Sequence, residues 1–205
     1  MAQASGTAAQ DATPGASPVA GEGGALALAE IPVNPGSEQP DALPDATLTI
    51  NLGQEIDTGD PQVLAFLNEI EISSKVYVPL LALNEENLPA GAGAESVTLS
   101  ADGTVYTFTI REGMTYTDGE PVTAHNYAYA IKRALSPVVA GNYSNTLYAV
   151  KGGQAWREAD PAGDTAELEA VVAESIKALD DRTLQITLDY AAGYFPYVMA
   201  IWVTY

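Results

Sequence analysis

The pattern of apolar and polar positions is clearest in the middle of the chain, where it predicts a β-hairpin. Residues 105–110, Val-Tyr-Thr-Phe-Thr-Ile, are rich in the β-branched and aromatic side chains that strands prefer. The pair Asp102-Gly103 precedes this run, and glycine tolerates the positive φ angle that a tight turn requires. Val97 and Leu99 lie on the other side of the turn and predict the start of the partner strand.

A helix is predicted after a second turn at Asp118-Gly119. Thr123 is a suitable cap, because its oxygen can accept a hydrogen bond from a free amide of the first helical turn. Pro137 ends the segment, since proline lacks the amide hydrogen that a helix needs. Apolar residues recur between these limits at helical spacing, so that one face of the helix is apolar: Tyr127, Ala130, Ile131, Ala134 and Leu135.

Towards the amino terminus, the pattern predicts a strand and another helix. The alternation of apolar and polar residues typical of a strand is carried by Leu48, Ile50 and Leu52. Residues 53–61 are expected to form a loop, and residues 62–75 predict a helix. One side of this helix carries four apolar residues and a serine: Val63, Phe66, Leu67, Ile70 and Ser74.

Towards the carboxyl terminus, a helical piece is expected around Trp156, and residues 166–174 predict a loop or a short helix. A strand could instead begin within the run that holds Val172, Ser175, Ile176 and Leu179. The chain then turns at Asp180-Asp181 and returns as a strand through Thr183, Leu184, Ile186 and Leu188. Because hairpins make the sheet partly antiparallel, the predicted fold class is mixed α and β.

The last segment, residues 194–205, is almost wholly apolar. An exposed apolar terminus of this size would promote association with another surface. We therefore expect that the chain is truncated, or that this segment packs against something outside the chain.

Residues 1–46 differ from the rest in composition, since they contain no lysine, arginine or aromatic residue and are rich in alanine, glycine and proline. Such a segment cannot bury enough apolar surface to offset the entropy lost on ordering. We interpret it as a disordered, low-complexity tether before a domain formed by residues 47–205; a mere terminal tail is the alternative.

Charge and composition narrow the classes of function. The net charge of −19 argues against nucleic acid and anionic membrane surfaces as partners, and it favours cationic or zwitterionic solutes. The chain has no cysteine, which excludes disulfides, a thiolate nucleophile and cysteine-based zinc sites. No apolar run approaches the roughly 18 residues of a membrane span.

Residues with catalytic chemistry do not form a recognisable constellation. His125 is the single histidine and lies off the apolar face of its predicted helix, so we expect it to be solvated or near the cap. Asp118 and Glu120 flank a glycine; a carboxylate pair can serve acid–base catalysis, but Asp-Gly is first a turn signal. We therefore predict no enzyme, no cofactor and no metal site, and keep a hydrolase using this acidic pair as an alternative.

Several segments, in the right order, resemble the oligopeptide-binding family, the solute-binding proteins of peptide and nickel ABC transporters (solute-binding family 5). These segments span residues 48–61, 77–81, 88–96, 106–111, 116–124 with a following helix that ends in Lys132-Arg133, and 177–188, followed by Tyr194-Phe195. The sequence departs from the family pattern at three places: Gly59 stands where a leucine is usual, Val97 where a tryptophan is usual, and Asn126 where an aspartate is usual.

The resemblance implies a fold of the type II periplasmic-binding-protein kind, in which two lobes close on a ligand. Residues 47–205 would then form an incomplete amino-terminal lobe with a mixed sheet, hairpins and packed helices. The segment before Thr47 resembles the linker that follows a lipid-attachment cysteine, and that cysteine is absent here. The expected role is extracytoplasmic capture of oligopeptides for an ABC permease.

By the same resemblance, ligand contact is assigned to two loops of the lobe. One holds Ala65, Phe66 and Leu67 after the pair Asp60-Pro61, and the other holds Tyr143 and Asn145. Tyr143 offers a flat apolar ring and a hydroxyl group, which suit a peptide backbone, although it could equally be a packing tyrosine. Tyr77 is expected to pack inside the lobe. A structural module that uses residues 194–205 as an interface is the further alternative.

Overall fold

The computed structural model describes Thr47 and residues 49–205; the predicted tether, residues 1–46, and Leu48 lie outside the described residues. The strands are β1 (Leu81–Leu83), β2 (Pro89–Gly91), β3 (Ala94–Leu99), β4 (Val105–Ile110), β5 (Ile176–Ala178) and β6 (Thr183–Thr187). The α-helices are α1 (Leu67–Val76), α2 (Ala124–Leu135), α3 (Gly153–Arg157), α4 (Ala166–Ser175) and α5 (Phe195–Val198). Two short 3-10 helices are η1 (Ser144–Leu147) and η2 (Trp202–Thr204).

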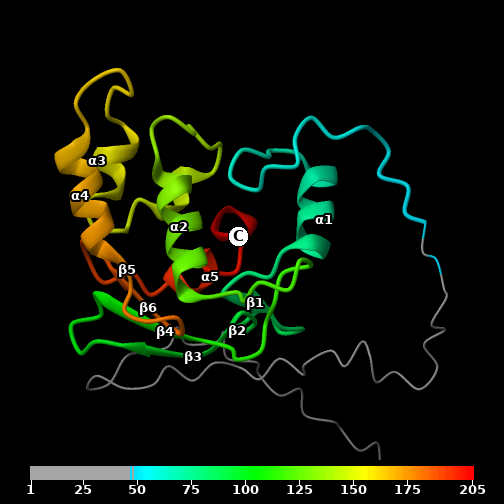
Figure 1. The fold of residues 1–205 in the computed structure, drawn as a ribbon, viewed down its shortest axis with the longest axis horizontal. Helices are drawn as coiled ribbons and strands as arrows, with labels where there is room; N and C mark the ends of the chain where they lie inside the picture. Colours follow the sequence, from blue (N-terminus) through cyan, green and yellow to red (C-terminus); the bar gives the residue numbers. More distant parts are fainter. Residues whose placement is uncertain (1–46, 48) are drawn as a thin grey trace, which may run out of the picture.

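A four-stranded antiparallel sheet of order β3-β4-β6-β5 forms the base of the fold, and β1 pairs with β2 in a separate two-stranded sheet. The helices α2, α3 and α4 stand together on one side of the large sheet, whereas α1 stands apart from them (Figure 1). The mixed α and β class predicted from the sequence is confirmed.

The hairpin predicted in the middle of the chain is also confirmed. β4 spans the predicted residues and pairs with β3, with Phe108 opposite Val97 on one side and opposite Leu184 of β6 on the other. Gly103 takes a φ angle of 74° in the turn, which explains why a glycine stands there.

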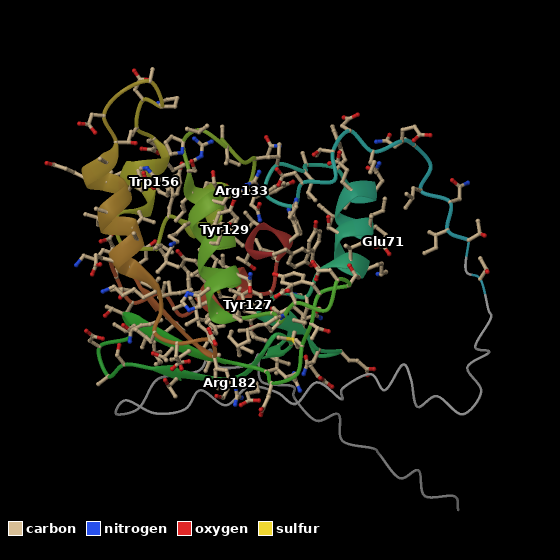
Figure 2. All side chains as sticks on the ribbon, in the orientation of Figure 1. Glu71, Tyr127, Tyr129, Arg133, Trp156 and Arg182 are labelled. Carbon is tan, nitrogen blue, oxygen red and sulfur yellow. The ribbon has the colours of Figure 1, made fainter. Side chains whose placement is uncertain are left out.

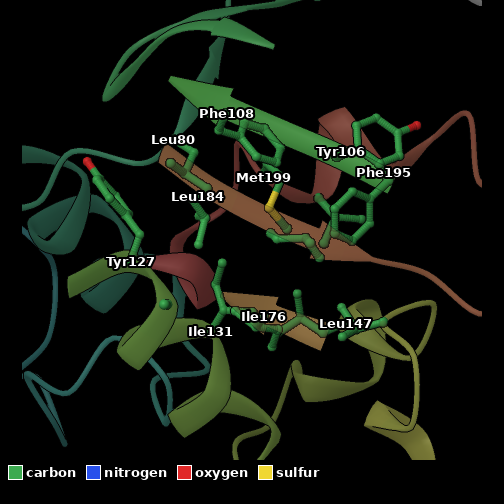
Figure 3. Close-up of a cluster of buried hydrophobic side chains, with 14 of the residues drawn as sticks. Leu80, Tyr106, Phe108, Tyr127, Ile131, Leu147, Ile176, Leu184, Phe195 and Met199 are labelled. Atoms are coloured by element: carbon green, nitrogen blue, oxygen red, sulfur yellow. The ribbon is translucent and has the colours of Figure 1, made fainter. Parts of the chain in front are cut away.

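The core lies between the large sheet and α2, which packs against β5 and β6 (Figure 3). All five apolar residues predicted for the face of α2 are buried. Thr123 flanks the helix as predicted and forms a capping box with Asn126, whose Oδ1 accepts both the amide and the hydroxyl group of Thr123 at 2.8 Å. Tyr127 reaches past the core and donates its hydroxyl hydrogen to the carbonyl oxygen of Val78 at 3.0 Å.

The apolar carboxyl-terminal segment packs within this fold, so the expectation that it faces something outside the chain is wrong. Phe195, Met199 and Val203 are buried, and α5 packs against β1. The amide of Leu81 donates to the carbonyl oxygen of Met199 at 3.1 Å, which ties the segment to the small sheet. Most of the apolar side chains of the segment are covered by the core of their own chain, whereas Tyr194 and Tyr197 remain exposed, so the interface-module alternative loses most of the apolar surface on which it depends.

The amino-terminal strand prediction is wrong for the residues that the structure describes. Residues 49–52 form no strand, and Ile50 is exposed. A strand needs a neighbour to satisfy its backbone groups, and none of the described strands pairs with this segment.

The helix predicted over residues 62–75 begins later, at Leu67, and its orientation differs from the prediction. Residues before it turn back, since the amides of Val63 and Leu64 both donate to the carbonyl oxygen of Asp60 at 3.1 Å. The buried side of α1 is polar, whereas Leu67 is 84% exposed. Apolar spacing failed here because hydrogen bonds of polar side chains set the helix orientation.

In the carboxyl-terminal half, the structure contains both the short helix and the strand that the sequence left open as alternatives. The polar run becomes the short helix α4, and the strand β5 follows it directly.

Among the described residues, no helix is long and apolar enough to cross a membrane, and no group of side chains has the composition of a metal site.

Candidate functional site

The structure brings Tyr143 against the loop that contains Ala65, two segments that lie far apart in the sequence. Asn142 Nδ2 donates to the carbonyl oxygen of Val63 at 2.6 Å. The hydroxyl group of Tyr143 lies 3.4 Å from the carbonyl oxygen of Ala65, a long hydrogen bond. Two of the five predicted ligand residues therefore meet at one surface, which we call the candidate site.

The other three predicted residues extend from this contact. Phe66 and Leu67 continue from Ala65 to the start of α1 and are both exposed. Asn145 lies in η1, where its side chain is exposed. Their exposure leaves them accessible to a ligand.

Trp202 is part of this surface and was missed in the sequence, where it counted only as one residue of an apolar run. The ring of Tyr143 meets the indole edge to face, with ring centroids 5.0 Å apart and an interplanar angle of 84°. Trp202 Nε1 is buried and has no hydrogen-bond partner among the described residues. The packing holds the tyrosine ring in place beside the Ala65 loop.

A hydrogen-bonded ion pair anchors the loop to α2. Arg133 lies on α2 (Figure 2). It donates to both carboxylate oxygens of Asp60, at 2.7 Å to Oδ1 and 2.5 Å to Oδ2. The guanidinium also donates to Gln62 Oε1, and Gln62 Nε2 donates to the carbonyl oxygen of Tyr205 at 2.6 Å. This network connects the loop, α2 and the segment after η2, so it fixes where Ala65 lies relative to Tyr143 and Trp202.

The ion pair shifts both of its groups towards the charged state. The pKa of Asp60 lies below its ordinary value of 3.8, chiefly because Arg133 donates a hydrogen bond to its carboxylate. The same hydrogen bond raises the pKa of Arg133 above its ordinary value. Because both side chains remain about 30% exposed, the pair orders the loop more than it stabilises the fold.

Glu69 holds the rest of the loop from inside. Its carboxylate accepts four backbone amides: those of Asp57 and Thr58 at 3.0 and 3.2 Å, and those of Ala65 and Phe66 at 2.8 and 3.0 Å. The side chain is 2% exposed, and the bonds from Phe66 and Ala65 hold the pKa of Glu69 below its ordinary value of 4.5. Sequence reasoning missed this residue because a lone glutamate in a helix normally signals solvent.

The acidic pair and the histidine occupy positions that fit ordinary structural roles. Asp118 Oδ1 accepts the amide of Glu120 at 3.1 Å, as in an Asx turn, and both residues are exposed. His125 Nε2 lies 3.6 Å from Asp181 Oδ1 at an exposed site. No contact of these residues in the described part of the chain aligns a base with a nucleophile.

The comparison with known families shows to which class of protein this fold belongs. Residues 89–205 match the family described as bacterial extracellular solute-binding proteins, family 5. The match spans more than half of the chain, and the chain belongs to this family.

Individual relatives are similar over most of the described residues. The chain is 29% identical over 167 residues to the oligopeptide-binding protein OppA of Bacillus subtilis, which covers 82% of this chain and 29% of the relative. It is 36% identical over 116 residues to the dipeptide-binding protein DppE of Bacillus subtilis, covering 57% of this chain and 20% of the relative.

Solved structures support the same fold. The substrate-binding domain of an oligopeptide ABC transporter from Bacillus anthracis superposes with a TM-score of 0.66 at 32% identity, covering 74% of this chain and 28% of that one. Listeria monocytogenes OppA bound to peptide gives a TM-score of 0.65 at 31% identity, covering 73% of this chain and 28% of that one. The chain therefore spans less than a third of the length of these relatives.

Proposed function

We propose that residues 47–205 form one lobe of an extracytoplasmic solute-binding protein that captures short peptides for an ABC importer. The observation that carries this proposal is the similarity, at 31% identity, to a family member whose structure was solved with peptide bound. The role is binding and delivery; the lobe performs no chemistry on the peptide.

The candidate site supports a peptide as the ligand. Tyr143 is held edge-on by Trp202 and is only partly buried, so its ring and hydroxyl group can contact an extended backbone. Phe66 and Leu67 are exposed beside Ala65 and offer apolar surface to the side chains of a peptide. The net charge of −19 favours peptides with cationic groups over acidic ones.

The complete binding site would lie between this lobe and a second one, because the relatives are more than three times as long as the matched part. Closure of two lobes excludes water and strengthens the hydrogen bonds that hold a peptide backbone. Residues 1–46 would act as a tether to a lipid anchor at the outer face of the membrane, and permease subunits would receive the peptide.

Peptide binding can be measured by isothermal titration calorimetry on a chimera in which this chain replaces the matched part of the Bacillus subtilis OppA. We expect the chimera to bind short peptides and the chain alone to bind them far more weakly. Tyr143→Ala should weaken binding about 5- to 30-fold, equivalent to about 1–2 kcal/mol. Tyr129→Ala, at an exposed tyrosine of α2, is the matched control and should bind normally.

Two results would contradict the proposal. Tight peptide binding by the chain alone would rule out a site shared between two lobes. A folded chimera that binds no peptide would show that this lobe does not serve peptide capture. Cleavage of the peptide that is lost in Asp118→Asn would instead support the hydrolase alternative.

A further inference from the structure

The indole of Trp202 carries a hydrogen-bond donor that the described part of the chain leaves without a partner. Its Nε1 atom is buried, and none of the described residues offers it an acceptor. A buried N–H group without an acceptor has lost its bonds to water and gained none in return, so such groups are rare in folded proteins. The ring of Tyr143 packs edge to face on this indole, which places the unused donor at the candidate site.

The backbone that carries Trp202 is firmly held. η2 packs against both α1 and α2 and lies between them (Figure 1), and Thr204 within it is buried. The carbonyl oxygen of Tyr205 accepts from Gln62 Nε2 at 2.6 Å. The ring of Tyr205 lies 5.8 Å from that of Tyr77, which is 37% exposed and does not pack inside the lobe as expected. The indole is therefore fixed from behind, and an acceptor must come to it from the side of Tyr143.

Tyr143 is held less firmly than the indole beneath it. Its hydroxyl group lies 3.4 Å from the carbonyl oxygen of Ala65, a distance at which a hydrogen bond is weak. Its ring is only partly buried, and an edge-to-face contact is typically worth less than the penalty for a buried donor without an acceptor. A ligand that offers the tyrosine hydroxyl a closer acceptor would therefore draw the ring away from Ala65 and uncover the indole N–H.

We propose that Trp202 is a ligand-binding residue of the candidate site, and that its indole N–H donates to a backbone carbonyl oxygen of the bound peptide once the ring of Tyr143 has moved. This proposal rests on the peptide-binding function proposed above and names the group that the site recognises. Carbonyl oxygens on one side of an extended peptide recur about every 7 Å, a spacing that suits two donors whose rings lie 5.0 Å apart. One carbonyl then binds the tyrosine hydroxyl and the next binds the indole.

Binding is tested in the chimera with Bacillus subtilis OppA by isothermal titration calorimetry, with a tetrapeptide of three alanines and one lysine as the probe. Trp202→Phe removes the N–H group and keeps an aromatic ring against Tyr143. We expect this variant to bind the tetrapeptide about 3- to 10-fold more weakly. Trp156→Phe is the matched control and should bind normally, because Trp156 also has a buried Nε1 without a partner among the described residues but lies in the core.

Nuclear magnetic resonance shows whether the N–H group itself is engaged. The tryptophans of the chimera are labelled at the indole nitrogen, and the signal of Trp202 is the one that is absent from the spectrum of Trp202→Phe. We expect saturating tetrapeptide to shift this proton signal downfield and to slow its exchange with solvent, because the proton becomes hydrogen-bonded to the peptide. The signal of Trp156 should stay where it is.

Two results would overturn the proposal while leaving the peptide-binding function intact. The first is a chimera that binds the tetrapeptide with an unmoved Trp202 signal and equal affinity in Trp202→Phe. The second is weaker binding by Trp202→Phe with a Trp202 signal that the tetrapeptide does not move, because the indole would then act through packing alone. A folded chimera that binds no peptide refutes the function and this proposal together. If Trp202→Phe does not fold, Trp202→Tyr assigns the signal and its response to the tetrapeptide decides the question.

Discussion

Phe195→Ala tests whether the carboxyl-terminal segment is part of the core. Phe195 is fully buried, and its ring centroid lies 5.2 Å from that of Tyr106 on β4. Removing a buried phenylalanine ring takes away its transfer free energy and leaves a cavity, at a cost of about 3–5 kcal/mol. For a domain of this size, each kcal/mol lowers the melting temperature by about 2–4 °C, which gives a decrease of about 6–20 °C.

The assay is equilibrium unfolding in urea, followed by circular dichroism and by tryptophan fluorescence. Tyr197→Ala is the control on the same segment, because Tyr197 is 38% exposed and should cost less than about 1 kcal/mol. The reasoning is refuted if Phe195→Ala and Tyr197→Ala lower the free energy of unfolding by the same small amount. The segment would then lie loosely on the surface of the fold.

Three further substitutions test the network beneath the candidate site and one close backbone contact. Asp60 contributes stability that is present above pH 3.8 and is lost as the pH falls through its lowered pKa in the folded state. Asp60→Asn should therefore cost about 1 kcal/mol at neutral pH, after allowance for its exposure, and nothing at pH values below that pKa, as urea unfolding over a pH series would show; an equal cost at every pH would contradict it. Glu69→Gln should speed hydrogen exchange of the four amides that the carboxylate accepts while leaving exchange in β4 unchanged. Gly93→Ala should destabilise the fold by about 1–3 kcal/mol, because a Cβ atom there would lie 2.1 Å from the hydroxyl oxygen of Tyr127, whereas Gly59→Ala meets no atom within 4 Å and should be neutral.

The elements that the sequence predicted well are those in which local spacing and tertiary packing agree. In β4, alternate residues such as Tyr106 and Phe108 face the core, and in α2 the residues at helical spacing, such as Ile131, do the same. Turn residues set the limits of both elements, so neither boundary depended on distant parts of the chain.

The elements that the sequence predicted wrongly depend on groups that the local pattern does not reveal. The orientation of α1 is set by Glu69, whose carboxylate collects amides from residues on both sides of the loop. The burial of Phe195 depends on contact with Tyr106 of β4, which lies far away in the sequence. Apolarity predicted that this segment would be buried, but it could not say against what.

The candidate site likewise has a part that could be predicted from the sequence and a part that could not. Family resemblance placed Ala65 and Tyr143 at one site, and the structure brings them together. The positioning roles of Arg133 and Trp202 could not be predicted from the sequence, because their partners lie 73 and 59 residues away.

The measurement that tests the central claim most directly is peptide uptake by Bacillus subtilis cells in which the chimera replaces OppA. Immunoblotting confirms that the chimera reaches the outer face of the membrane, and uptake of a radiolabelled short peptide is then followed. The account predicts that the chimera restores uptake and that Tyr143→Ala reduces it, with Tyr129→Ala as the unaffected control. Normal amounts of folded chimera at the cell surface without any peptide uptake would contradict it.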